Sequence, residues 1–256
     1  MKKIIIANWK MNPKTSKEAK NLAQNIERGA KNASKIEVVL APPFPFIESV
    51  AKVVKKSKIG AQDVFWENPQ AGGGAYTGQV SMNQLKSLGV KYIIVGHSER
   101  RVLGETEEMI NKKLKTILKA GVKAVLCVGE RERHHDEVFP LMVRDEIYGA
   151  LLGIKKPLLK NLIVTYEPIW AISTEKNGKP ATPKNVFEIS ILIRKELFHL
   201  FGKKIALQIP ILYGGSVNEK NATLFVSDGR VDGLLVGGAS LNTKSFVKII
   251  DTVAHI

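Results

Sequence analysis

The sequence predicts an α/β protein built as one (β/α)8 barrel domain that spans residues 1–256. Eight short apolar runs rich in β-branched residues recur along the chain, and segments of helical character lie between them. Most of these runs are apolar at consecutive positions rather than alternating, which is typical of parallel strands buried on both faces. No linker-like stretch divides the chain of 256 residues, and closed barrels commonly use about 250 residues as one domain.

The eight predicted strands follow one another at regular intervals. The first is read as a strand rather than a signal peptide, because its short apolar run meets Asn8 and Lys10. Pro210 falls near the start of the seventh strand, where a missing N–H group is tolerated. The predicted strands cover residues 3–8, 37–41, 58–62, 92–95, 124–128, 162–166, 209–213 and 233–236.

Amphipathic helices are predicted between several strands, because apolar residues recur there with the helical period. Ser, Thr or Asn stands near the start of several of these segments, as expected for helix N-caps. A doubly wound sheet is the competing fold, but it usually has fewer strands and a glycine-rich turn where this chain has Asn8-Trp9-Lys10. The clearest predicted helices cover residues 16–28, 106–119, 183–200 and 243–253.

Composition and charge narrow the possible partners and location. No apolar run approaches the roughly 20 residues needed to cross a bilayer, so no membrane association is expected. The single cysteine, Cys127, allows no intrachain disulfide, and we expect a cytoplasmic protein. The net charge of +15 could attract nucleic acids or small anions. The lysines are scattered and no nucleic-acid-binding motif is evident, so we expect no specific nucleic-acid partner.

Chemically active side chains stand directly after the predicted strands, where barrels of this kind place their active sites. Lys10, His97 and Glu167 follow the first, fourth and sixth strands. A Lys can stabilise an oxyanion, a His can donate a hydrogen bond or carry a proton, and a Glu can remove a proton from carbon. Singly, such a His is often a structural residue and such a Glu a loop acid. Together they suit proton abstraction beside a carbonyl group.

Glycines after the seventh and eighth strands predict a phosphate-binding site. Gly214-Gly215-Ser216 and Gly237-Gly238 occupy the two loops that bind phosphate in many barrels, where free backbone N–H groups can point at an anion. Tight turns that need glycine are the alternative interpretation. Beside the charged residues, these loops indicate a phosphorylated carbonyl substrate.

Six short segments contain these residues and their neighbours: NWKMN (8–12), VGHSERR (95–101), CVGE (127–130), YEPIWAI (166–172), LYGGSV (212–217) and LVGGASL (235–241). They resemble the signature sequences of the triosephosphate isomerase family, and no other family known to us combines them in this order. The resemblance runs from the first strand to the last helix. It implies a TIM barrel that interconverts dihydroxyacetone phosphate and D-glyceraldehyde 3-phosphate through an enediolate, in glycolysis and gluconeogenesis. It implies no metal or cofactor, because the carbonyl group of the substrate acidifies the neighbouring C–H.

The resemblance also implies a role for each matching residue. Glu167 would remove the proton, and a neutral His97 would polarise the carbonyl group and move protons between the two oxygens. Lys10, oriented by Glu99, would supply positive charge, and Asn8 would help to bind the carbonyl oxygen. The phosphate would be bound by Ser173, Ser216, Gly237 and Gly238.

A homodimer is a further implication of the resemblance. The third βα loop, residues 67–78, would insert near the partner's active site, where Thr77 would reach Asn8 and Glu99 of the partner subunit. The family commonly has Glu where this chain has Gln79. A cross-subunit ion pair with Arg100 would then become a hydrogen bond to a neutral acceptor, which costs about 1 kcal/mol if buried. We still expect a dimer.

The segment after Glu167 departs from the family pattern. In the family this segment is a lid that excludes water, so that the enediolate does not lose phosphate. Residues 173–178 stand where the family usually has a shorter Gly-Thr-Gly stretch. We expect hinges at residues 168–170 and 179–181, with a longer tip that bulges outward and leaves closure intact.

Other conspicuous residues are interpreted as structural. His134-His135-Asp136 has no third metal ligand at a useful spacing, Cys127 has no evident activating base, and residues 131–133 suit a solvated surface.

Two rival functions can be set against the isomerase: a barrel that binds polyanions through its charge, and a phosphate-binding barrel that acts on another sugar or an amino-acid precursor.

Overall fold

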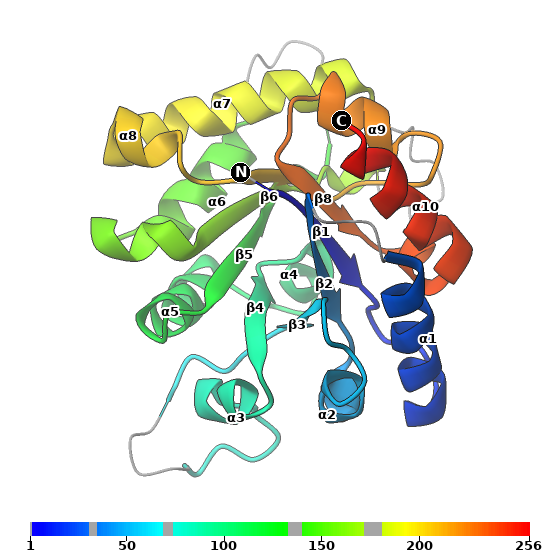
Figure 1. Ribbon diagram of the computed structural model, residues 1–256. Helices are drawn as coiled ribbons and strands as arrows, with labels where there is room; N and C mark the ends of the chain where they lie inside the picture. Colours follow the sequence, from blue (N-terminus) through cyan, green and yellow to red (C-terminus); the bar gives the residue numbers. More distant parts are fainter. Residues whose placement is uncertain (1, 31–34, 69–73, 133–139, 172–180) are drawn as a thin grey trace.

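The computed structural model describes residues 2–30, 35–68, 74–132, 140–171 and 181–256 (Figure 1). Eight parallel strands pair in sequence order, and the first pairs with the last to close a barrel. This arrangement confirms the predicted (β/α)8 fold and excludes the doubly wound sheet. The strands are β1 (Lys3–Asn8), β2 (Ile36–Ala41), β3 (Lys58–Ala61), β4 (Val90–Val95), β5 (Lys123–Val128), β6 (Leu162–Tyr166), β7 (Ile211–Tyr213) and β8 (Gly233–Val236).

The strand positions agree with the prediction apart from small shifts at their ends. β7 begins after Pro210, which has no N–H group for the ladder, although its carbonyl oxygen still accepts from the Val164 N–H at 3.0 Å. β4 begins earlier than predicted, at Val90. The exposed Lys91 interrupts the apolar run there, so hydrophobicity alone does not assign the buried Val90 to the strand.

Helices surround the barrel (Figure 1). The four predicted helices are confirmed as α1, α5, α7 and α10, each preceded by a Thr or Asn whose side chain accepts a backbone N–H of the first turn. The helices are α1 (Ser16–Gly29), α2 (Ile47–Ala51), α3 (Met82–Ser87), α4 (Ser98–Val102), α5 (Glu107–Lys119), α6 (Leu141–Leu151), α7 (Pro183–Phe201), α8 (Lys203–Ala206), α9 (Ala222–Ser227) and α10 (Thr243–Ala254), with 3-10 turns η2 (Phe44–Phe46), η3 (Lys156–Asn161), η4 (Ile169–Ala171) and η5 (Gly238–Leu241).

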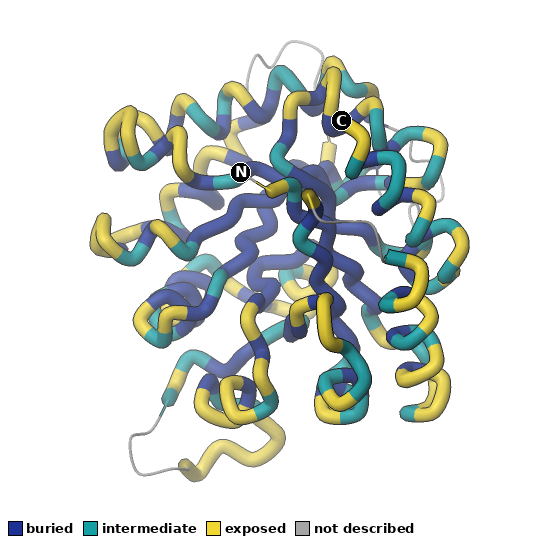
Figure 2. The backbone as a smooth tube through the Cα atoms, viewed as in Figure 1, coloured by how far each residue is buried: buried dark blue, intermediate teal, exposed yellow. Residues whose placement is uncertain are grey.

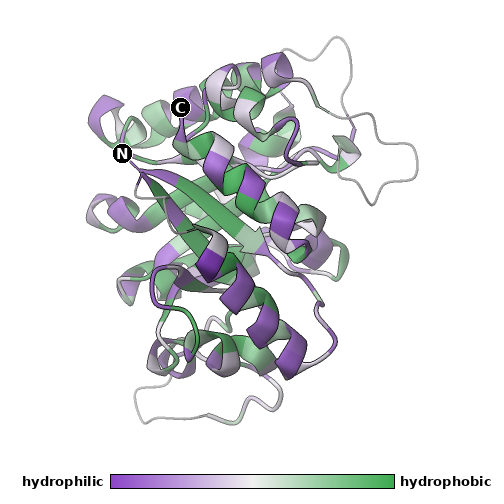
Figure 3. Cartoon of the chain, turned by 45° about the vertical axis from the view of Figure 1, so that its right-hand side comes forward, coloured by the Kyte–Doolittle hydropathy of each residue, from purple (hydrophilic) through white to green (hydrophobic). Residues whose placement is uncertain are grey.

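The core has two layers because successive strand residues point to opposite faces. In β1, Ile4 and Ile6 belong to the cluster inside the barrel, whereas Ile5 and Ala7 pack outward under the helices. Figure 2 shows the strands buried and the outer faces of the helices exposed. Figure 3 shows mainly hydrophobic residues in the strands and a mixture of hydrophilic and hydrophobic residues in the helices. Two-sided burial explains the consecutive apolar runs of the sequence.

Cys127 lies in the inner cluster and is fully buried. Burial raises the pKa of its thiol well above the usual range, and the negative charge of Glu167 adds to the effect. The thiol therefore stays protonated, as expected of a structural cysteine.

Within the described ranges, every helix falls short of the length and apolarity that crossing a membrane would require.

Candidate active site

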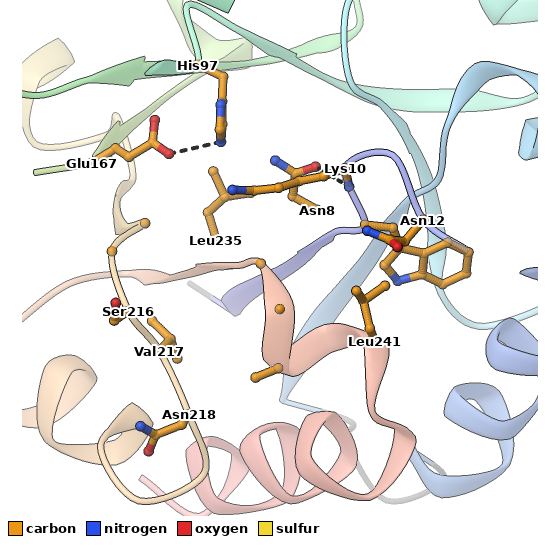
Figure 4. Close-up of a pocket in the computed structure, with 16 residues that line it drawn as sticks. Asn8, Lys10, Asn12, His97, Glu167, Ser216, Val217, Asn218, Leu235 and Leu241 are labelled. Carbon is orange, nitrogen blue, oxygen red and sulfur yellow. Dashed lines mark hydrogen bonds and ion pairs between the residues drawn. The ribbon is translucent and has the colours of Figure 1, made fainter. Parts of the chain in front are cut away.

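One cavity of about 440 Å³ lies at the carboxyl ends of the strands (Figure 4). Parallel strands bring these ends to one rim, so residues far apart in the sequence meet there. Asn8, Lys10, His97 and Glu167 all line the cavity, together with the glycine-rich loops after β7 and β8. The predicted phosphate-binding residues in its wall are Ser216, Gly237 and Gly238.

His97 and Glu167 face each other at this rim (Figure 4). Both side chains are almost fully buried, and His97 Nε2 lies 2.9 Å from Glu167 Oε1. The other carboxylate oxygen accepts the backbone N–H of Ser98 at 3.1 Å. His97 is the N-cap of α4, and its Nδ1 accepts the Glu99 N–H at 3.2 Å. An accepting Nδ1 places the proton of a neutral imidazole on Nε2, directed at Glu167.

Lys10 adopts a left-handed backbone conformation directly after β1, with φ of 52°. This conformation costs a residue with a side chain roughly 1–2 kcal/mol. Its backbone N–H donates to Asn8 Oδ1 at 3.1 Å, and its carbonyl oxygen accepts from Gln62 Nε2 at 2.9 Å. The ammonium group pairs with Glu99 Oε1 at 2.6 Å. Backbone and side chain are thus both held in place, and the side chain extends into the cavity (Figure 4).

Gln62 is a supporting residue that the sequence analysis missed. Its side-chain amide also donates to the Ala41 carbonyl at 2.8 Å, so it ties the loop after β1 to the end of β2. The available signal was its position: a polar amide at the last residue of the predicted strand 58–62, on the side of the barrel where the other site residues gather.

The loops after β7 and β8 form the glycine-rich wall of the cavity. Gly215 cannot be replaced without disturbance, since a Cβ atom there would lie 2.2 Å from Tyr213 Oη. The backbone N–H and hydroxyl of Ser216 donate to the Ala171 carbonyl oxygen, at 3.3 and 2.7 Å. A Cβ atom at Gly237 would lie 3.7 Å from Lys10 Cε, so this wall lies beside the positive charge.

Glu130 supports the chain beyond Glu167, a role that the sequence analysis did not assign. Its buried carboxylate accepts from Tyr166 Oη at 2.7 Å and from Trp170 Nε1 at 2.8 Å. It therefore fixes the end of β6 and the 3-10 turn η4 that follows Glu167.

Some predicted features lie outside the described residues. These are Ser173, the longer lid segment with residues 179 and 180 of its second hinge, and His134-His135-Asp136. Arg131 and Glu132 are described and exposed, in agreement with a solvated surface. The exposed Arg100 pairs with Asp63 of its own chain, at 2.9 Å between Nη2 and Oδ2.

The barrel and its site define a class of enzyme. A carboxylate, an imidazole and an ammonium group meet beside glycine-rich loops at the carboxyl ends of β7 and β8. This arrangement is that of an isomerase that moves a proton next to the carbonyl group of a phosphorylated substrate.

Comparison with known proteins identifies the family. The family model described as triosephosphate isomerase matches residues 3–253. Curated relatives named triosephosphate isomerase include those of Thermoanaerobacter pseudethanolicus, 42% identical with 97% of this chain and 98% of the relative covered, and Alkaliphilus oremlandii, 40% identical with 98% and 99% covered. The relative of Acetivibrio thermocellus is 43% identical, with 97% of each chain covered. The chain belongs to the triosephosphate isomerase family and interconverts dihydroxyacetone phosphate and glyceraldehyde 3-phosphate.

Proposed function

We propose that the isomerisation uses Glu167 as the base and neutral His97 as the electrophile, and proceeds through an enediolate. The observation that carries this proposal is the pairing of the two side chains, with Nε2 of His97 2.9 Å from Oε1 of Glu167 and Nδ1 occupied by the Glu99 N–H. Proton donor and proton acceptor therefore stand together in a buried site, ready to act on adjacent atoms of one substrate.

The substrate would take over hydrogen bonds that the free site makes internally. The carbonyl oxygen of the substrate accepts the Nε2–H of His97. The Glu167 carboxylate gives up its hydrogen bonds from His97 and Ser98 and turns toward the neighbouring carbon. Glu167 removes a proton from that carbon, and the C–H electron pair forms the C=C bond while the carbonyl electrons move onto oxygen. Proton movement between the oxygens through His97 and return of the proton from Glu167 to the other carbon complete the isomerisation.

The remaining residues stabilise charge and hold the substrate. Lys10 places an ammonium group against the developing oxyanion, and Asn8 contacts the same oxygen. The glycine-rich wall formed by Ser216, Gly237 and Gly238 binds the phosphate, with Lys10 beside it. The donors of Ser216 exchange their present acceptor, the Ala171 carbonyl oxygen, for a phosphate oxygen.

Replacing Lys10 by Met tests the electrostatic part of this mechanism. We expect kcat/KM for both triose phosphates to fall by about 10²- to 10³-fold, because a fixed charge next to the oxyanion is lost. The measurement is a coupled isomerase assay in each direction, with Lys17→Met as control because Lys17 is exposed on α1. Equal activity of Lys10→Met and Lys17→Met would show that Lys10 is not part of the site.

We further propose a homodimer formed through the loop that carries Thr77. Thr77 is exposed in the single chain, and large apolar side chains are exposed in the loops after β1 and β4, including Met11 (91%) and Leu103 (78%). A dimer that covered these side chains would remove apolar surface from water, which favours association. Sedimentation equilibrium should give twice the chain mass, and the mass of one chain at every concentration would exclude the dimer.

The cytoplasmic location stays a prediction, supported by the single, buried cysteine.

A further inference from the structure

Glu146 is a buried acid behind the active site to which the proposed mechanism gives no task. It lies on α6, and its side chain is only 10% exposed. Oε2 accepts the backbone N–H of Gly129 at 2.9 Å, and Oε1 lies 3.4 Å from Arg101 Nη1. Both contacts connect α6 to the carboxyl-terminal rim of the barrel.

Arg101, on α4, links the ends of two strands. Its Nε donates to the Gly96 carbonyl at 2.7 Å, directly before His97, and its Nη2 donates to the Cys127 carbonyl at 3.2 Å. Glu107 and Glu146 balance the charge of this mostly buried guanidinium group. The position of β4 relative to β5 therefore depends on an ion-pair cluster that includes Glu146.

The segment that Glu146 holds lies directly against Glu167. A Cβ atom on Gly129 would lie 1.9 Å from the Glu167 carbonyl oxygen, so the two backbones touch. The Glu167 N–H donates to the Val128 carbonyl oxygen at 2.8 Å, and the Ile169 N–H donates to the Glu130 backbone carbonyl oxygen at 2.9 Å. Residues 128–130 thus support the backbone that carries the Glu167 side chain.

Glu146 also has access to solvent. It lines a second cavity of about 660 Å³, whose wall includes Ser98, Arg101 and Ile169. Ser98 is the residue whose N–H holds Glu167 on the other side. This cavity lets a proton reach a carboxylate that is otherwise enclosed by protein.

We propose that Glu146 is a positioning residue for Glu167, acting through Gly129 and Arg101, and that loss of its negative charge lowers turnover. This inference rests on the proposed role of Glu167 as the base. A charged carboxylate is the stronger acceptor for the Gly129 N–H and the stronger partner for Arg101.

The pKa of Glu146 lies near neutral pH, so a change of pH around neutrality changes its charge. Burial raises the pKa of Glu146 to about 7; Arg101 opposes the rise, and the negative charges of Glu107 and Glu167 add to it. Of the other charged groups near α6, Glu196 on α7 binds Tyr148 Oη instead. Among the residues that the structure describes, the charged groups that border the cavity are Arg101, Glu107, Arg131, Asp145 and Glu146.

Activity and stability should respond to this proton in opposite directions. Below about pH 7 Glu146 is neutral, its hold on Arg101 and Gly129 weakens, and turnover falls. The pKa in the folded chain lies above the unfolded value of 4.5, so the folded state binds the proton more tightly. Glu146 therefore favours folding most at low pH, and this contribution is lost as the pH rises through about 7. If Glu146 only stabilised the fold, turnover and stability would not change in opposite directions with pH.

The test compares pH–rate profiles of wild type, Glu146→Gln and Asp145→Asn, from about pH 5 to about pH 9. Gln keeps the size and one acceptor oxygen of Glu146 but has no charge. We expect the ratio of wild-type kcat to Glu146→Gln kcat to be near one in acid and to rise to roughly three- to tenfold in base. The midpoint should lie near pH 7, with KM unchanged. Titration of the substrate phosphate affects both enzymes and cancels in the ratio.

Asp145 is the matched control, because it is an exposed carboxylate on the same helix at the rim of the same cavity. Asp145→Asn should reproduce the wild-type profile, and a pH-independent ratio for Glu146→Gln would overturn the proposal. Should Glu146→Gln fold poorly, NMR titration of the wild-type Glu146 carboxyl decides instead, since a midpoint near an ordinary glutamate value would also overturn it. A Glu167→Gln enzyme that keeps the wild-type kcat would refute the assignment of Glu167 as the base. If Glu167→Gln is inactive but the ratio of wild-type kcat to Glu146→Gln kcat does not change with pH, only the positioning role of Glu146 is refuted.

Discussion

Glu167→Gln is expected to lower kcat by about 10²- to 10⁴-fold with little change in KM, because the amide cannot accept the proton from carbon. Gln has nearly the same shape, and its oxygen can still accept one of the hydrogen bonds that His97 and Ser98 now donate. The binding site therefore stays intact while the base is lost. A coupled assay with each triose phosphate gives both constants.

Glu132→Gln is the control for this substitution. Glu132 is an exposed carboxylate on the loop after β5, so its replacement removes the same charge without touching the cavity. It should keep the wild-type kcat. If Glu167→Gln matches Glu132→Gln in kcat, Glu167 is not the base, and another residue of the cavity must remove the proton.

Lys113→Met is expected to destabilise the fold by about 3–5 kcal/mol, the largest stability effect that we anticipate. The Lys113 ammonium group is 3% exposed and lies between two acids, with Nζ 2.6 Å from Asp63 Oδ1 and paired with the buried Glu105. Met fills a similar volume but leaves the buried Glu105 without this cation, whereas Asp63 keeps its ion pair with the exposed Arg100. Glu105 also accepts the Gly96 N–H at 3.1 Å, so the damage extends to the strand before His97.

Urea unfolding at a fixed protein concentration measures this effect, since a dimer would make stability depend on concentration. Lys112→Met is the control, because Lys112 is exposed on the same helix and pairs with Glu108 one turn away. It should change the free energy of unfolding by less than about 0.5 kcal/mol. Burial already raises the pKa of Asp63. The penalty for Lys113→Met should therefore shrink as the pH falls and Asp63 becomes neutral. An equal loss in both variants would contradict this account.

The short helices show where periodicity stops being informative. α2, α4 and α9 are five or six residues long, which is less than two turns, so they could not be recognised from a 3.6-residue repeat. α6 is longer but was also missed. It exposes Leu141 and Met142 and buries Glu146, so polar and apolar residues do not divide cleanly between its faces.

The sequence by itself determined the eightfold alternation of strands and helices, the caps of the long helices, and the placement of Lys10, His97 and Glu167 after their strands. These features depend on neighbours in the chain or on the rule that parallel strands end on one rim, so local patterns record them. Only the tertiary structure decided that Gln62 supports Lys10, that Lys113 pairs with both Glu105 and Asp63, and that Glu146 holds Gly129 beneath Glu167. Each of these contacts joins a side chain to a group from another segment of the chain. Their energies depend on burial and distance, which no single segment of the sequence encodes.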